Sequence, residues 1–192
     1  ELRERSGAGF MDCKKALQES RGDLSQAIDY LRKAGVVKAA RKMGRIVSEG
    51  LIGKSVSPDG KTAVLVEVNC ETDFVARTDP FQAFVFSVAE RVRTACPENL
   101  EDLLRLKNGS ETVEETLKGT IGKLGENMSI KRFQWTKASP GEVLGHYLHA
   151  GSKIGAVVKT RASAVTPEMA RDVAMHVAAM HPSYLNRQSV PP

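Results

Sequence analysis

The pattern of hydrophobic and polar positions divides the chain into a helical first part and a second part that contains strands. Behind Asp23, apolar residues recur at the spacing of an amphipathic helix, and Asp23 with Gln26 predicts a capped start for it. Asp12 is predicted to cap the preceding helix, and Gly35 to end the later one in a left-handed turn. The apolar stripe of the later helix consists of Leu24, Ala27, Ile28 and Leu31. Residues 1–48 therefore read as three short helices and a basic connector.

From residue 51 onward the pattern changes to that of strands, and it occurs twice. Residues 51–68 align with residues 143–160 without a gap, and Gly53 matches Gly145. Each copy reads as two strands joined by a glycine-containing turn, followed by a helix with a proline near its start. The repeat predicts an α+β fold of two related units, each a small antiparallel sheet with helices on one face.

The segment between the two copies has helical spacing first and ends in a strand. Residues 98–135 are predicted to form a helix, a Lys-Asn-Gly-Ser break, a second helix that ends at Gly122 or Gly125, and the strand MSIKRFQW. Ile130 and Phe133 need not share a face of that strand, which is compatible with a bulge or twist.

These elements suggest three structural parts. Residues 1–48 are expected to form the three-helix module with its connector. Residues 49–136 are expected to form the first α+β subdomain, and residues 137–192 the second. Three helices in so short a module make a marginal fold, so we expect the module to lean on the rest of the chain.

Composition excludes few classes of protein. The net charge of +5 makes a nucleic-acid partner worth considering, but aromatic residues make up only 5% and no aromatic-basic motif is present. Three scattered cysteines without a CxxC pair indicate reduced thiols rather than a zinc site or disulfide frame. No apolar run approaches the roughly 20 residues needed to cross a bilayer, and no membrane partner is expected. Glu1 is not a natural start, which is compatible with a removed or omitted presequence.

The sequence shows no arrangement typical of an enzyme. It contains no GxxxxGK[ST] phosphate loop and no GxSxG elbow. His176 and His181 are five residues apart, so a helix would turn them to different faces and a shared metal is disfavoured. We therefore expect neither catalytic residues nor a cofactor or bound metal.

The stretch NCETDFVART lies between a predicted buried strand and a predicted helix. Asp73 and Phe74 fall in this connection, which should be exposed, and short connections between strong elements are where binding residues concentrate. The alternative is a strand-end cap with a half-buried ring. A partner-binding role is the favoured interpretation.

Several stretches together resemble the elongation factor Ts family. They are ERSGAGFMDCKKALQESRGDLSQAIDYLRKAG, EGLIG, VEVNCETDFVART, GKLGENMSIKR and VLGHYLHAG, in family order. The resemblance implies a ubiquitin-associated-like three-helix module followed by two α+β subdomains. The sequence KLGENM and the neighbouring Trp135 resemble the mitochondrial branch of the family. This resemblance implies location in the mitochondrial matrix, with a bacterial cytoplasm or a plastid as alternatives.

The same resemblance implies a function and a set of contact residues. Members of the family release GDP from the GTPase elongation factor Tu, without bond-making chemistry of their own. Phe74 would enter an apolar slot of that partner and Asp73 would perturb the surroundings of its magnesium ion. The residues that match family contacts are Thr72, Asp73, Phe74, Phe10, Met11, Lys14, Leu124, Gly125 and His149.

Other roles stay open for some of these residues. For Phe10 and Met11 the equal alternative is packing between the helices of their own module. For Leu124 and Gly125 it is a helix end, and for His149 an ordinary strand residue. The rival function is a binding module without exchange activity that recognises a ubiquitin-like, ribosomal or RNA partner.

Overall fold

The N-terminal part consists of helices, as the sequence predicts. The computed structural model describes residues 1–161 and 163–191. Its first helices are α1 (Leu2–Ser6), α2 (Phe10–Glu19) and α3 (Leu24–Ala40). They share a small apolar cluster whose buried members are Leu2, Cys13, Ala16 and Ala27. The side chain of Asp23 accepts a hydrogen bond from the Gln26 amide, so the predicted cap of α3 is confirmed.

Two sequence predictions about these helices are wrong. Helix α2 begins at Phe10 with Gly9 as its N-cap, so Asp12 lies inside the first turn and instead pairs with Lys38 at 2.8 Å. Gly35 does not end α3, which continues to Ala40. Packing overrides the local preference of glycine for a helix end, because a helix of the central part crosses α3 here and its Gly122 lies against the Gly35 backbone.

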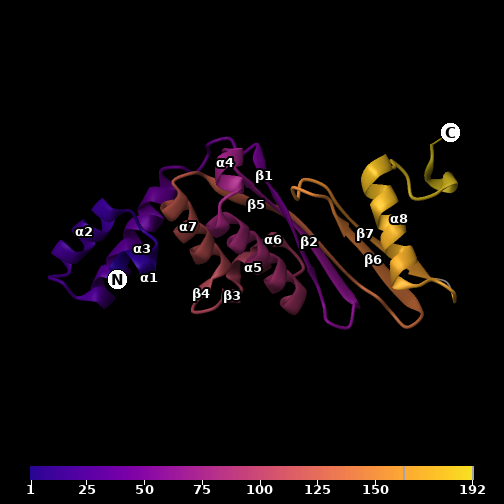
Figure 1. Ribbon diagram of the computed structural model, residues 1–192, viewed down its shortest axis with the longest axis horizontal. Helices are drawn as coiled ribbons and strands as arrows, with labels where there is room; N and C mark the ends of the chain where they lie inside the picture. The colour runs from indigo at the N-terminus through magenta and orange to yellow at the C-terminus, as the bar shows by residue number, and fades with distance from the viewer. Residues whose placement is uncertain (162, 192) are drawn as a thin grey trace.

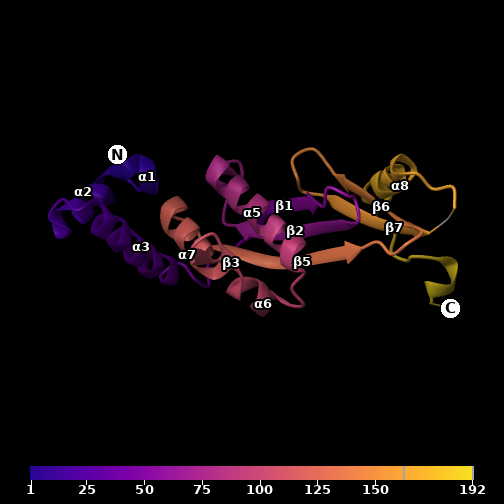
Figure 2. The ribbon, with the colours of Figure 1, turned by 90° about the horizontal axis from the view of Figure 1, so that it is seen from below.

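The central part is a three-stranded antiparallel sheet in the order β1-β2-β5. Its strands are β1 (Glu49–Val56), β2 (Thr62–Cys70) and β5 (Met128–Lys137). The register between β2 and β5 shifts between Glu67 and Val68, which confirms the irregularity expected in the last strand. Figures 1 and 2 show α5 (Asp79–Ala95), α6 (Leu100–Arg105) and α7 (Val113–Leu124) beside this sheet.

The main core lies between this sheet and α5. Strand β2 alternates as an antiparallel strand does: every second residue from Val64 to Cys70 is buried against the core, and the residues between them are only partly buried. Burying each large apolar side chain contributes about 1.5–3 kcal/mol. The largest fully buried side chains of the two elements are Val64, Val66, Val68, Cys70, Phe81, Val88 and Val92. This core fixes the two ends of the NCETDFVART connection.

The second hairpin confirms the internal repeat at the level of register. It consists of β6 (Glu142–Leu148) and β7 (Gly155–Arg161), with α8 (Pro167–Met180) packed on it. Gly53 pairs with Val66 in the first hairpin, and Gly145 pairs with Val158 in the second, which are equivalent positions in the gapless alignment. Each glycine lies against the helix that covers its hairpin, where a Cβ atom would collide. The α+β fold class is confirmed.

The remaining elements are short. They are α4 (Asp73–Ala76), β3 (Lys107–Asn108), β4 (Glu111–Thr112) and the 3-10 helix η1 (Arg187–Ser189). Helix α7 ends in a left-handed residue, Gly125, at one of the two predicted stops. Within residues 1–161 and 163–191, no helix combines the length and the apolarity that a membrane crossing requires.

Candidate functional site

The TDF connection, named for Thr72, Asp73 and Phe74, is a single helical turn that presents an aromatic ring to solvent. Thr72 has an extended backbone and caps α4 by accepting a hydrogen bond from the Val75 amide at 3.3 Å. Ala76 is buried and Val75 packs against the main core, so both anchor the turn from below. The side chain of Phe74 is 79% exposed. The half-buried ring considered from the sequence is therefore wrong, because the two anchoring residues occupy the inward face of the turn.

Asp73 is not an isolated carboxylate. Its Oδ2 atom lies 2.8 Å from Nη2 of Arg77, four residues later. Both side chains remain largely in water, so this pair contributes little to stability, on the order of 0.3–0.5 kcal/mol. The pair places the Asp73 carboxylate beside the Arg77 guanidinium, and the backbone carbonyl of Arg77 accepts a hydrogen bond from Gln82 Nε2 at 3.2 Å.

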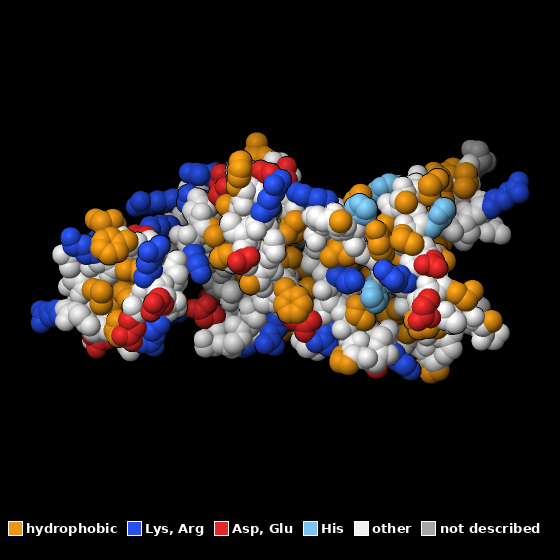
Figure 3. Space-filling view, viewed as in Figure 1, with side chains coloured by type: hydrophobic (Ala, Val, Ile, Leu, Met, Phe, Trp, Pro, Cys, Tyr) orange, Lys and Arg blue, Asp and Glu red, His pale blue; other side chains and the backbone are white. Residues whose placement is uncertain are grey.

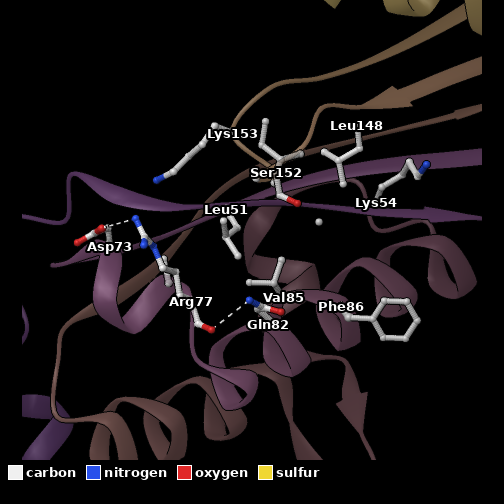
Figure 4. A pocket seen from close by; sticks show the side chains of 14 residues that line it. Leu51, Lys54, Asp73, Arg77, Gln82, Val85, Phe86, Leu148, Ser152 and Lys153 are labelled. Carbon is white, nitrogen blue, oxygen red and sulfur yellow. Dashed lines mark hydrogen bonds and ion pairs between the residues drawn. The ribbon is translucent and has the colours of Figure 1, made fainter.

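A groove of about 660 Å³ opens beside the turn (Figure 4). Arg77, Gln82 and Val85 lie on one side of it, and Ser152 and Lys153 lie on the other. The second wall comes from the turn between β6 and β7, which joins strand β1 through a hydrogen bond from the Ile52 amide to the Ser152 carbonyl at 2.7 Å. The groove therefore spans the two sheets.

The turn and its surroundings form a mixed apolar and charged edge of the molecule. Figure 1 places α4 and the β6–β7 turn along the same edge. In Figure 3, hydrophobic side chains stand out at this edge over α4 and are bordered by Lys and Arg side chains. An apolar tip within a charged rim is typical of a protein interface.

The residues of the N-terminal module expected to bind a partner lie on the surface. Phe10 and Met11 are 70% and 69% exposed, and Lys14 is also exposed. Packing between the helices of the module, the alternative for Phe10 and Met11, does not describe these positions. All three residues belong to α2, at the end of the molecule distant from β6 and β7 (Figure 1).

Leu124 and Gly125 form the end of α7, and both are tied to neighbouring segments. Leu124 packs against the main core. Gly125 has a φ of 80° and donates its amide to the carbonyl of Ile121. Its own carbonyl accepts a hydrogen bond from Lys42 of the connector. The structural role predicted for this pair is present, and a partner contact at Gly125 remains compatible with it because the residue is exposed.

His149 lies just after β6 rather than within a strand. Its side chain is exposed and forms a hydrogen bond of 2.8 Å with the hydroxyl of Tyr147. It belongs to the same turn that forms the far wall of the groove. The structure therefore brings Thr72, Asp73 and Phe74 together, and leaves His149 and the α2 residues on separate elements.

Sequence reasoning missed the residues that support the turn. Glu126 accepts two hydrogen bonds from Thr72, and Glu71 accepts one from the amide of Asn127. Glu126 and Asn127 belong to the stretch GKLGENMSIKR, but nothing in the spacing shows that it meets residues more than fifty positions earlier. The Asp73–Arg77 pair does have a local signal, the four-residue spacing of opposite charges.

The described residues offer little support for a resident metal. Within them, no three His, Cys, Asp or Glu side chains gather as a possible metal site. The site therefore consists of an exposed ring, an oriented carboxylate and a groove, which suit protein recognition.

Comparison with known proteins identifies similar sequences. A sequence model of the family described as Elongation factor TS matches residues 71–192. Elongation factor Ts of Nitratiruptor sp. is 45% identical over 196 residues, a match that covers 100% of this chain and 64% of the relative. Elongation factor Ts of Clostridium kluyveri is 48% identical over 196 residues, covering 99% of this chain and 64% of the relative. The chain thus spans less than two thirds of the length of these relatives.

Proposed function

The chain belongs to the elongation factor Ts family, and from that premise we propose that it releases GDP from the GTPase elongation factor Tu during translation elongation. The observation that carries this proposal is the ring of Phe74, 79% exposed on a turn whose inner residues are fixed in the main core. An exposed aromatic side chain on a rigid support loses little conformational entropy when a partner binds it.

The proposed action depends on the sensitivity of a nucleotide-phosphate site to small displacements of the groups that form it. Loop amides and a helix N-terminus hold nucleotide phosphates, and magnesium requires near-octahedral ligands at about 2.0–2.1 Å. Burial of Phe74 in an apolar slot of the partner would contribute about 1.5–3 kcal/mol toward moving such elements. Asp73, oriented by Arg77, would bring a negative charge toward the magnesium surroundings.

Exchange by this route is reciprocal. If this protein weakens GDP binding to the partner, GDP must weaken the binding of this protein by the same factor. The complex therefore passes through a ternary state and is released by incoming nucleotide. Phe10, Met11, Lys14, Leu124, Gly125 and His149 are proposed as further contacts that hold the partner while Phe74 acts.

The test is the release of fluorescent GDP from elongation factor Tu. The wild-type chain should accelerate release, and Phe74→Ala should reduce the acceleration about 10- to 100-fold, the equivalent of the burial energy of one ring. Met180→Ala is the control, because Met180 is another exposed apolar side chain, 65% exposed on α8, and does not line the groove. It should retain most of the activity.

Thermal unfolding should be unchanged in Phe74→Ala, because its ring is in water. A wild-type chain that binds the partner but leaves GDP release unaltered would support the rival binding module. Equal activity of the wild type and Phe74→Ala would contradict the role of the ring.

The compartment is a finer part of the proposal. The sequence KLGENM and Trp135 support a mitochondrial protein, which would be located in the mitochondrial matrix. The bacterial origin of the two relatives supports a bacterial cytoplasm instead, with a plastid as the third alternative. Sequencing the gene upstream of Glu1 tests this, because a cleavable Arg-rich, acid-poor targeting segment is expected only in an organellar precursor.

A further inference from the structure

Two segments distant in sequence are joined directly below the TDF turn. Glu126 accepts hydrogen bonds from both donors of Thr72: Oε2 lies 3.0 Å from the amide nitrogen, and Oε1 lies 2.6 Å from the hydroxyl. Beside them, Oε1 of Glu71 accepts a hydrogen bond from the Asn127 amide at 2.6 Å. The end of β2 and the loop after α7 are thus linked in both directions.

The contact with Glu126 determines what the Thr72 hydroxyl can do. The hydroxyl donates its only proton to the carboxylate, so its lone pairs remain free for the Val75 amide that it caps. Donation to a charged acceptor also polarises the hydroxyl and strengthens the bond that it accepts. The carboxylate therefore fixes the cap that starts α4, one residue before Asp73 and two before Phe74.

The position of Glu126 is itself well determined. It follows Gly125, whose carbonyl is bound by Lys42, and precedes Asn127, which is buried. Nδ2 of Asn127 donates to the carbonyl of Arg45 at 2.8 Å. The loop is therefore attached to the connector on both sides of Glu126, and it provides a rigid base for the turn.

In the described part of the chain, the Glu126 carboxylate binds no residue other than Thr72. Both of its hydrogen bonds go to Thr72, and it takes part in none of the ion pairs found there. The side chain is partly exposed, so the burial of apolar surface does not account for its place. Its geometry is specific to orienting one residue.

We propose that Glu126 is a positioning residue for nucleotide exchange, which orients Phe74 by holding the Thr72 cap. This inference rests on the proposed function of Phe74. Glu126 acts through Thr72 rather than by touching the partner, so its effect on exchange must depend on the presence of the ring at position 74.

The first test compares two substitutions at the same position. Glu126→Ala removes both acceptors and should lower the acceleration of GDP release from the partner about tenfold, as expected when about 1.4 kcal/mol of orientation energy is lost. Glu126→Gln should stay within about threefold of the wild type, because an amide oxygen can accept from the Thr72 amide and its NH₂ group can donate to the hydroxyl. Glu114→Ala, which removes another glutamate, one that pairs with Lys118 on α7, is the control and should leave release unchanged.

The second test is a double-mutant cycle with Phe74→Ala. If Glu126 acts by orienting the ring, Glu126→Ala should have less than a twofold effect on release in the Phe74→Ala background. A further tenfold loss there would overturn the proposal, since it would show that Glu126 acts independently of Phe74. An active Glu126→Ala protein in the wild-type background would overturn it as well.

A third measurement separates this inference from the proposed function, because it needs no partner. Hydrogen exchange of the Thr72 and Val75 amides in the isolated chain should be at least about tenfold faster in Glu126→Ala than in Glu126→Gln or the wild type. Unchanged protection would refute the positioning role even if exchange activity is present. If protection falls but the wild type releases no GDP, the proposed function fails while the support of the turn by Glu126 stands.

Discussion

A methyl group added to Gly122 should separate the N-terminal module from the central part. Gly122 lies on α7 where this helix crosses α3, and a Cβ atom built on it would lie 2.7 Å from Cα and 3.0 Å from the carbonyl oxygen of Gly35. Both contacts are with backbone, which cannot rotate aside as a side chain can. Gly122→Ala must therefore move one helix relative to the other.

Two opposing effects determine the size of the change. Replacing a helical glycine by alanine stabilises a helix by about 0.5–1 kcal/mol. Overpacking a close contact costs about 1–3 kcal/mol, and a collision with backbone belongs to the upper part of that range. We therefore expect Gly122→Ala to lower the free energy of unfolding by about 1–2 kcal/mol, or the melting temperature by about 2–8 °C for a chain of this size.

Two matched alanine substitutions isolate the collision. Gly119 lies on the same helix and Gly35 on the opposing one, and a Cβ atom built on either meets no atom within 4 Å. Gly119→Ala and Gly35→Ala should therefore show only the helix-propensity gain of about 0.5–1 kcal/mol and melt above the wild type. Thermal unfolding followed by circular dichroism at 222 nm compares the three variants.

The sign of the shift decides the argument. If Gly122→Ala melts at or above the wild-type temperature, together with the two controls, the crossing of α3 and α7 is looser than the structure shows. A drop shared by all three variants would instead mean that glycine flexibility, rather than close approach, matters in these helices.

Three further outcomes follow from the structure. Gly145→Ala should destabilise the second hairpin by about 3 kcal/mol or more, because its Cβ atom would lie 1.9 Å from the Ala170 carbonyl oxygen. Gly155→Ala is the control, because the nearest contacts of its Cβ atom are side-chain atoms at 3.3 Å. In urea titrations of both variants, Gly155→Ala should lose less stability. The Ser139 amide and the Arg161 guanidinium lower the pKa of Glu142 from 4.5 to about 2, so the stability that this carboxylate contributes is present above pH 4.5 and is lost as the pH falls toward 2. The free energy of unfolding of Glu142→Gln should therefore fall less between pH 6 and pH 3 than that of the wild type. An equal fall in both proteins would contradict this. Burial, assisted by the charge of Glu126, raises the pKa of Cys70 to about 11. Ellman's reagent at pH 8 should therefore modify the partly exposed Cys96 before Cys70. Equal rates of modification of the two cysteines, followed by peptide mass spectrometry, would show that Cys70 is accessible.

The hairpins were predictable because their signals are local and repeated. Alternating apolar residues, a glycine turn and a following helix with an early proline give the element types, and the gapless alignment shows which positions of the two hairpins are equivalent. The exposed position of Phe74 was also predictable in outline, since a short connection follows a buried strand. The orientation of the ring was not, because it depends on the burial of Val75 and Ala76 in a core formed by distant elements.

The errors have a common physical cause. Asp12 and Gly35 have side chains typical of a helix start and a helix stop, and local propensity alone assigns those roles to them. In the structure Asp12 instead pairs with Lys38, and Gly35 lies inside α3, where Gly122 of α7 approaches its backbone. Both outcomes depend on residues at least 26 positions away, which intrinsic preference does not encode. Glu126 was overlooked for the same reason.

The proposed contact residues lie on separate elements, so their spacing depends on the joints between those elements. The Gly35–Gly122 crossing places α2 relative to the central part, and the Glu126–Thr72 contact places Phe74 on it. The Ile52–Ser152 hydrogen bond and the Lys153–Glu49 ion pair at 2.5 Å place the turn that carries His149. Apart from Thr72, none of these joints contains a residue proposed to contact the partner. Changes at the joints should therefore alter exchange while every inserting side chain is still present, which distinguishes geometric support from direct contact.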